Sequence, residues 1–286
     1  NCMLKEGLDK VVLKKLGLKY KNPDLSSWNI FLEKYKNPKT IVKIALIGKY
    51  VELQDSYKSI LESFIHSGAV NDVKVEVTPI HSEHIDKKNI EKKLEKFNGV
   101  LVAPGFGERG VEGKIEAIKY VRLKNIPFFG ICLGMQMAVI EFCRNVLNMN
   151  GANSTEMDEK TKYPVIDLMD DQKNIVNKGG TMRLGSWNCK LNNKSLVYKI
   201  YNSNTIYERH RHRYEFNSKY IKEIEENGLV ATGINIDTGL VEIIELKNHS
   251  WFIGVQFHPE YKSTVLNPHP LFVSFISAAL KNYNNQ

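Results

Sequence analysis

Short runs of apolar residues alternate with helical patterns through the first half of the chain. A run that is apolar at every position predicts a strand buried on both faces. The predicted strands cover residues 42–50, 73–79, 99–103 and 127–131, and the helices between them cover 55–65, 87–97 and 115–124. Strands that alternate with helices predict an α/β fold, with a mostly parallel central sheet and helices on both faces.

The second half of the chain is richer in short polar turns and β-patterns. We predict strands at residues 181–191, 229–236, 240–246 and 251–256, and a closing helix through Leu271, Phe275 and Leu280. Closely spaced strands of this kind predict an antiparallel β excursion beside the main sheet.

Residues 1–41 carry two short helical patterns, on either side of Asn22-Pro23-Asp24. Ser26 or Ser27 is a candidate N-cap for the second pattern. Helices this short do not build a core of their own. We therefore interpret residues 1–41 as a helical linker packed onto a domain that spans 42–286. Because the chain does not start with methionine, we also expect it to be a piece of a longer protein.

The composition is that of an ordinary soluble globular protein, with 42% hydrophobic and 25% charged residues. No apolar run approaches the length of a membrane span, and no signal-peptide pattern opens the chain. The formal net charge is +8, but the lysines alternate with glutamates as on solvated helix surfaces, which predicts neither a nucleic-acid nor a membrane partner. The four cysteines show neither metal-ligand nor disulfide spacing, which predicts no metal site and a cytoplasmic location.

Cys132 lies between a predicted strand and a predicted helix, in the sequence Gly130-Ile131-Cys132-Leu133-Gly134. A Gly-x-Cys-x-Gly pattern at such a junction matches the nucleophile elbow, a strained turn that presents one side chain at the top of a sheet. The N-terminus of the following helix favours the thiolate form of a cysteine. The alternative is a small buried cysteine at a tight junction, and Cys143, inside the helix, is expected to be a core residue of that kind.

The segment Gln256-Phe257-His258-Pro259-Glu260 contains the residue types that a nucleophilic cysteine needs. A residue before proline favours extended backbone, and in extended backbone residues two apart share a face. We therefore predict that His258 is the base and that Glu260 is the carboxylate that orients it. With Cys132 they form a candidate Cys-His-Glu triad.

The loop at residues 104–110 follows one predicted strand and precedes a helix, where phosphate-binding loops also occur. It lacks both the Gly-Lys-Ser/Thr ending and the Gly-x-Gly-x-x-Gly pattern of nucleotide-phosphate loops. We interpret it as an oxyanion loop across from Cys132, at the carboxyl edge of the sheet. Its N–H groups would stabilise the negative charge of a tetrahedral intermediate.

The tract Glu208-Arg209-His210-Arg211-His212-Arg213-Tyr214 alternates charged residues with imidazoles. In extended backbone Arg209, Arg211 and Arg213 share one face. A nucleic-acid contact is one alternative, but the tract is short and has a single aromatic neighbour. We interpret it as a segment that recognises a carboxylate or phosphate on a small substrate or effector.

The chain order Cys, His, Glu and the glycine loop resemble the class I glutamine amidotransferases. More specifically, seven segments spread over nearly the whole chain resemble the CTP synthase family. These segments are residues 44–50, 105–113, 129–136, 152–156, 179–185, 208–215 and 256–260. The resemblance identifies 1–41 as a linker from an absent amidoligase domain and 42–286 as the glutamine amidotransferase domain.

The resemblance implies hydrolysis of L-glutamine to glutamate and ammonia, with Cys132 attacking the side-chain amide, His258 shuttling protons and Glu260 orienting it. The family's glutamine-binding positions fall here on Gly105, Leu133, Gly134, Met135, Gln136, Glu156 and Arg213. Among them, Glu156 would meet the α-amino group of the substrate. The lid that the family uses in activation by GTP falls here on Phe106, Glu108, Arg109 and Gly110.

The same resemblance implies that no cofactor binds in this domain. Ammonia would travel to the absent amidoligase half, where ATP, UTP and Mg bind, and would aminate UTP to CTP. GTP would act as an allosteric activator, and the full-length form would be a homotetramer.

One segment departs from the family, which usually shows Pro-Gly-Gly-Phe-Gly where this chain has Ala103-Pro104-Gly105-Phe106-Gly107. Pro104 has no N–H to donate, which leaves the N–H groups of Gly105 and Leu133 as the predicted oxyanion hole. Two alternative functions stay open at this point. They are the glutaminase of another class I amidotransferase, and a non-catalytic GTP-sensing or docking module.

Overall fold

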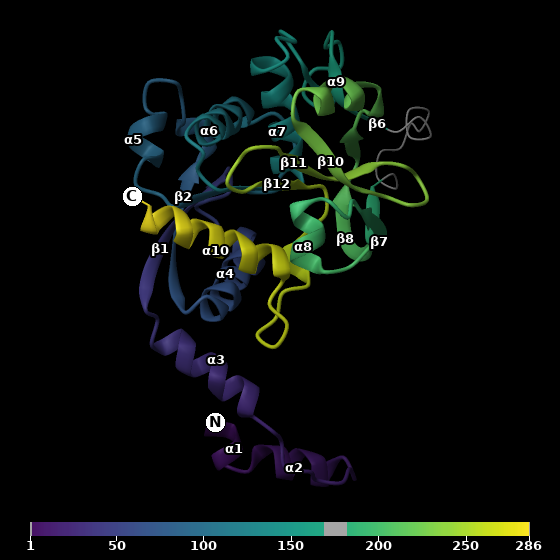
Figure 1. Cartoon of the computed structure of the whole chain (residues 1–286). Coiled ribbons are helices and arrows are strands. Elements are labelled where there is room, and N and C mark those ends of the chain that lie inside the picture. Colours follow the sequence, from purple (N-terminus) through teal and green to yellow (C-terminus); the bar gives the residue numbers. More distant parts are fainter. Residues whose placement is uncertain (1, 169–181, 286) are drawn as a thin grey trace.

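The computed structural model describes residues 2–168 and 182–285, which are drawn as a ribbon in Figure 1. Its main feature is a nine-stranded sheet with the strand order β2-β1-β3-β4-β12-β11-β10-β7-β8. The five strands at one side run parallel to one another. These are β2 (Val73–His81), β1 (Thr40–Gly48), β3 (Gly99–Val102), β4 (Phe128–Ile131) and β12 (Phe252–Val255).

The remaining strands of this sheet pair antiparallel. They are β11 (Val241–Leu246), β10 (Leu229–Ile234), β7 (Arg183–Leu191) and β8 (Thr205–His212). The predicted antiparallel excursion is therefore present, but it continues the main sheet through hydrogen bonds between β12 and β11. The predicted start of this region at Thr181 lies outside the described residues.

A second, three-stranded sheet consists of β5 (Asn153–Ser154), β6 (Pro164–Leu168) and β9 (Tyr214–Phe216). Helix α7 (Leu133–Asn145) contacts all three of these strands as well as β4 and β12 of the main sheet. Its residues from Leu133 to Cys143 are all buried, because a helix between two sheets has no solvent-facing side. The apolar residues on more than one side of this helix reflect that position.

Helices cover both faces of the main sheet, as predicted. One core lies under α5 (Ile90–Leu94), α6 (Val111–Leu123), α7 and α9 (Ile221–Glu226). The other lies under α4 (Lys58–Val70), α8 (Leu196–Tyr201) and α10 (Pro270–Asn284). The predicted α/β fold is confirmed.

Two local predictions were wrong, and a short polar side chain explains each. Helix α5 begins at Ile90 rather than at residue 87, because the carboxylate of Asp86 accepts hydrogen bonds from the N–H groups of Lys88 and Asn89 and holds them in a turn. In α3 (Ser26–Lys36) the N-cap is Leu25, not a serine. The carboxylate of Asp24 accepts the hydrogen bond of the Ser26 N–H instead.

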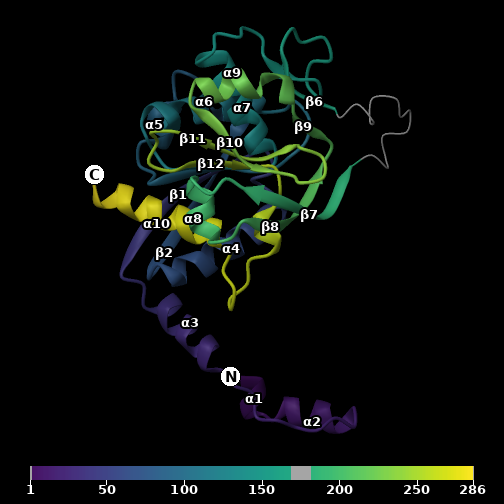
Figure 2. The same ribbon diagram turned by 45° about the vertical axis from the view of Figure 1, so that its right-hand side comes forward.

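The N-terminal helices differ in how they meet the domain. Helix α3 packs against α4, with the rings of Phe31 and His66 6.4 Å apart. None of the three helices has a buried residue, and both ribbon views show α1 (Cys2–Lys5) and α2 (Leu8–Lys15) extending away from the domain (Figures 1 and 2). Helix α3 therefore packs onto the domain, and the assignment of residues 1–41 as a linker stays a prediction.

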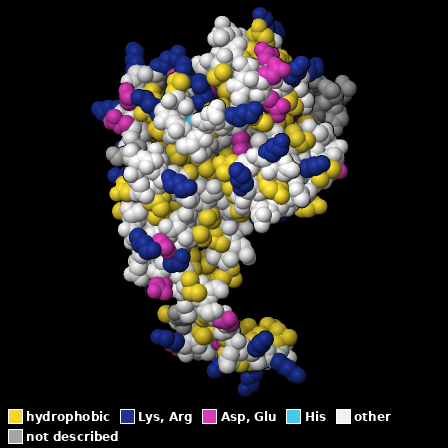
Figure 3. Space-filling model, in the orientation of Figure 1, with side chains coloured by type: hydrophobic (Ala, Val, Ile, Leu, Met, Phe, Trp, Pro, Cys, Tyr) yellow, Lys and Arg dark blue, Asp and Glu magenta, His cyan; other side chains and the backbone are white. Residues whose placement is uncertain are grey.

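On the face of the molecule that Figure 3 shows, Lys and Arg side chains are scattered rather than gathered in one stripe. This distribution agrees with the interpretation of the +8 charge as solvated surface. Within the described ranges, no helix combines the length and the apolar character needed to cross a bilayer.

Candidate active site

Cys132 occupies the single residue between β4 and α7. Its φ of 52° and ψ of −105° place a non-glycine residue in strained backbone. The flanking glycines are required by close backbone contacts. A Cβ at Gly134 would lie 2.3 Å from the carbonyl oxygen of Val102, and a Cβ at Gly130 would lie 2.8 Å from the backbone of Gly134. The geometry is that of the predicted nucleophile elbow.

The topology brings His258 to Cys132. Strands β4 and β12 are parallel neighbours with Ile131 opposite Val255, so both chain segments leave the sheet at the same edge. The N–H of Cys132 donates to the carbonyl oxygen of Val255 at 2.7 Å, and the N–H of His258 donates to that of Arg209 at 2.8 Å. These bonds fix the backbone on both sides of the site.

Glu260 contacts His258, with 2.8 Å between Nδ1 of the ring and Oε1 of the carboxylate. Both residues are buried. The predicted partnership is present, but the predicted cause was wrong. Residues Pro259–Tyr261 form a 3₁₀ turn, so the turn, and not an extended backbone, brings Glu260 back to the imidazole.

Nε2 of His258 is buried and has no hydrogen-bond partner among the described residues. Burial lowers the pKa of His258, but attraction to the Cys132 sulfur and the hydrogen bond to Glu260 outweigh it and raise the pKa to about 11. The ring is therefore an imidazolium at neutral pH when it faces a Cys132 thiolate. A thiolate beside a protonated histidine is the reactive form of a catalytic cysteine.

Lys114 is a site residue that the sequence reasoning missed. It is 0% exposed, and Nζ donates to the carbonyl oxygen of Ala103 at 3.3 Å. Nζ also lies 3.8 Å from the position that a Cβ at Gly105 would take, so the Lys114 side chain packs against the loop at residues 104–110. Lys114 lies on the buried face of α6 together with Val111 and Ile118. The helical period of the sequence could therefore have indicated that Lys114 is buried.

Burial and the charge of Lys49 lower the pKa of Lys114 to about 7, against the opposite effect of Cys132. Between pH 7 and 10.5 the unfolded chain therefore binds a proton that the folded chain does not. In this window we expect Lys114 to increase the free energy of unfolding by about 1.4 kcal/mol per pH unit as the pH rises. The free energy of unfolding of Lys114→Met, relative to that of the wild type, should therefore fall by the same amount for each pH unit.

Urea unfolding of both proteins at pH 7, 8 and 9 measures this slope. The exposed Lys124, at the end of α6, provides the control, since Lys124→Met should keep the pH slope that Lys114 contributes. Parallel pH dependences for Lys114→Met and the wild type would show that Lys114 stays protonated.

The loop at residues 104–110 is tied to three other elements. The N–H of Gly107 donates to Oε1 of Glu156 at 2.7 Å, and Lys49 Nζ donates to the carbonyl oxygen of Phe106. Arg109 forms an ion pair with Glu83, at 3.2 Å between Nε and Oε1. The predicted lid residues Phe106, Glu108, Arg109 and Gly110 all lie on this loop, and their relation to GTP stays a prediction.

The predicted glutamine-binding residues gather around the elbow. Leu133, Gly134, Met135 and Gln136 form the first turn of α7, and Gly105 lies beside Leu133, whose Cδ2 would be 3.5 Å from a Cβ at residue 105. Glu156 reaches the site through its bond to Gly107. Arg213 stands between β8 and β9. Their contacts with glutamine remain predictions.

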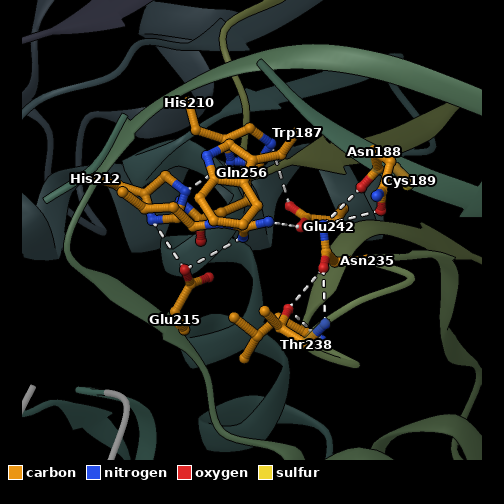
Figure 4. A network of polar contacts seen from close by, with 12 residues as sticks. Trp187, Asn188, Cys189, His210, His212, Glu215, Asn235, Thr238, Glu242 and Gln256 are labelled. Carbon is orange, nitrogen blue, oxygen red and sulfur yellow. Dashed lines mark hydrogen bonds and ion pairs between the residues drawn. The ribbon is translucent and has the colours of Figure 1, made fainter. Parts of the chain in front are cut away.

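The tract at residues 208–214 has two faces. Arg209 and Arg211 are exposed on one face of β8, as predicted, but Arg213 lies beyond the end of this strand. Glu208, His210 and His212 point to the buried face, which the same alternation could have revealed. Figure 4 shows the two histidines in a polar cluster with Gln256 among its residues.

Arg183 is the cation of this buried cluster. Its Nη2 lies 2.6 Å from Oε1 of Glu242, and its Nη1 lies 3.4 Å from Oε1 of Glu215. Burial raises the pKa of Glu215 to about 8 and that of Glu242 to about 7, and burial together with Arg183 lowers that of His212 to about 3. The cluster therefore holds neutral imidazoles and two acids that share one cation.

The clustered His and Glu side chains do not form a metal site. In residues 2–168 and 182–285, no group of three or more His, Cys, Asp or Glu could hold a metal ion.

Comparisons with known proteins agree with this geometry. A family model described as "Glutamine amidotransferase class-I" matches residues 52–278. The chain is 64% identical over 281 residues to a CTP synthase of Flavobacterium johnsoniae. The matched region covers 98% of this chain and 52% of that relative. It is 65% identical over 280 residues to a CTP synthase of Christiangramia forsetii, and the matched region covers 98% of this chain and 51% of that relative. The chain thus spans about half the length of the curated relatives it matches.

Solved structures share the fold. The glutaminase domain of Trypanosoma brucei CTPS, with bound acivicin, superposes with a TM-score of 0.79 at 38% identity, covering 84% of this chain and 94% of that one. A GMP synthase subunit from Thermoplasma acidophilum has a TM-score of 0.56 at 15% identity, covering 86% and 97%, and shows the fold alone. On the family match, the 38% identity and the elbow geometry, the chain belongs to the class I glutamine amidotransferase family.

Proposed function

We propose that this chain is the glutaminase half of a CTP synthase and hydrolyses L-glutamine to glutamate and ammonia. The observation that carries the proposal is the placement of Cys132, His258 and Glu260 at the ends of two adjacent parallel strands. The identity of 64–65% to CTP synthases favours this member of the family.

The proposed reaction proceeds through a thioester. The Cys132 thiolate attacks the side-chain carbonyl carbon of glutamine, and the N–H groups of Gly105 and Leu133 stabilise the oxyanion that forms. The Leu133 N–H is suited to this role because the first N–H groups of a helix have no acceptor within it. His258 gives its proton to the leaving ammonia, then takes one from the water that hydrolyses the thioester.

Substrate orientation is assigned to Glu156 and Arg213. A carboxylate has room for several hydrogen bonds, so Glu156 can bind the α-amino group of glutamine while it accepts from the Gly107 N–H. Substrate binding and loop position are then coupled through one side chain. We propose that Arg213 pairs with the α-carboxylate of glutamine.

The remaining parts of the proposal concern the whole enzyme. An amidoligase half that binds ATP, UTP and Mg would receive the ammonia and form CTP, in a cytoplasmic homotetramer activated by GTP. The exposed apolar side chains of residues 1–41, such as Val11, Leu16 and Ile30, support their role as a linker to that half. The loop with Phe106, Glu108, Arg109 and Gly110 is the proposed GTP-responsive lid.

The experiment that tests this function compares glutamine-dependent with ammonia-dependent CTP formation when Cys132 is replaced. The glutaminase of another class I amidotransferase would not support CTP formation with either nitrogen source. A non-catalytic docking module would give no glutamine-dependent formation even with Cys132 in place.

A further inference from the structure

Gln256 lies directly behind the nucleophile. It follows β12, is 0% exposed, and its Nε2 is 3.7 Å from Sγ of Cys132. Its Oε1 accepts a hydrogen bond from Nε2 of Gln136 at 3.2 Å. Nε2 of Gln136 also donates to the backbone carbonyl oxygen of Tyr214 at 2.9 Å. Three groups from distant parts of the sequence thus form one directed chain of hydrogen bonds that ends at the sulfur.

The Tyr214 carbonyl fixes the direction of this chain. A backbone carbonyl only accepts hydrogen bonds, so Gln136 must present its NH₂ group to it. That same NH₂ group faces Gln256, which must therefore present its oxygen to Gln136. The NH₂ group of Gln256 is then left pointing at Cys132, and neither amide can be turned around without placing two like groups against each other.

We propose that Gln256 is a further catalytic residue, whose amide N–H donates to the sulfur of Cys132 and stabilises its thiolate, with Gln136 and the Tyr214 carbonyl as positioning groups. The inference rests on Cys132 being the nucleophile of the proposed glutaminase. It assigns to Gln136 a role in addition to the predicted contact with glutamine.

A donor aimed at the sulfur serves two steps of the reaction. A hydrogen bond to an ionised acceptor is stronger than one to a neutral acceptor, so Gln256 favours the thiolate over the thiol before the attack. When water cleaves the thioester, the C–S bond breaks and the electron pair returns to the sulfur. The same N–H stabilises the thiolate that leaves.

Two titratable side chains face Cys132, and a substitution at residue 256 removes neither of them. They are the imidazole of His258, two residues after Gln256, and the amine of Lys114 on α6. A change in the ionisation of Cys132 when the Gln256 amide is removed therefore reports the hydrogen bond itself.

The test measures the rate of alkylation of Cys132 by iodoacetamide as a function of pH, resolved from the other cysteines by mass spectrometry of peptides. In Gln256→Leu we expect the pH of half-maximal rate to rise by about one unit, as loss of one hydrogen bond to a charged group predicts. In Gln136→Leu we expect a smaller rise, because the Gln256 amide then loses the partner that holds it. The alkylation measurement needs no glutamine. An unchanged midpoint, which would contradict the role of Gln256, is therefore distinguishable from a loss of glutamine hydrolysis, which would contradict the proposed function.

Thr232→Val is the matched control, since Thr232 is buried and its hydroxyl has no partner in the described residues. It should leave the midpoint at its wild-type value. Circular dichroism identifies the variants that fold, and a shift in either folded glutamine variant supports the proposal. Wild-type midpoints in the folded glutamine variants, or an equal shift in Thr232→Val, would overturn it.

Discussion

Replacing Cys132 by alanine in the full-length enzyme should abolish glutamine-dependent CTP formation and leave ammonia-dependent formation nearly intact. The alanine cannot form the thioester, so no ammonia is released from glutamine. In the proposed enzyme the amination of UTP takes place in the amidoligase half, which free ammonia would supply directly. Initial rates of CTP formation with glutamine and with ammonium chloride measure both activities in one preparation.

Cys143→Ala provides the matched control for this prediction. Cys143 lies on the same helix, is 0% exposed, and has its pKa raised to about 12 by burial and neighbouring acidic groups, as expected of an inert core thiol. A folded Cys143→Ala variant should keep both activities. If Cys132→Ala lost the two activities together, the separation into a nitrogen-releasing and a nitrogen-accepting half would be wrong.

Replacing Gly105 by proline should lower glutaminase turnover by about a hundredfold or more, because it deletes one of the two proposed oxyanion donors. Leu133, next to Gly105 in space, supplies the other donor. Pro104→Gly should be far milder. It removes no hydrogen bond to the oxyanion and mainly loosens the backbone.

Glutaminase turnover of both variants in the GTP-activated full-length enzyme tests this assignment, with circular dichroism as the check on folding. The pair is matched because both changes exchange glycine and proline at adjacent positions of one loop. A well-folded Gly105→Pro variant with near-normal turnover would remove Gly105 from the oxyanion hole.

The elements that local patterns define could be predicted from the sequence. The apolar runs that became β3 and β4 are buried at every residue, and the Gly-x-Cys-x-Gly pattern gave the elbow because its steric requirement is local. The contact of Glu260 with His258 was predicted from an extended backbone, whereas the structure has a 3₁₀ turn there. The prediction still named the right pair, because both conformations bring residues two apart near each other.

The interior polar groups could not be placed in the same way. Burial of an amine such as Lys114, or of His210 and His212, runs against the cost of removing polar groups from water. The period of α6 and the alternation of β8 mark these positions as buried, but a reading that takes only apolar residues as core leaves them on the surface. The Gln256–Cys132 contact joins residues 124 positions apart, and only the pairing of β4 with β12 brings them together.

The most direct test of the central claim is mass spectrometry of the chain after treatment with a glutamine-mimicking diazo-ketone electrophile. Cys132 combines a helix N-terminus with an adjacent His258 and the proposed substrate-binding turn, whereas Cys143 and Cys189 are buried thiols whose pKa burial raises, and Cys2 is exposed on α1. The account predicts one adduct, on Cys132, with Cys2, Cys143 and Cys189 unmodified. An adduct on Cys143 with Cys132 unmodified would contradict it.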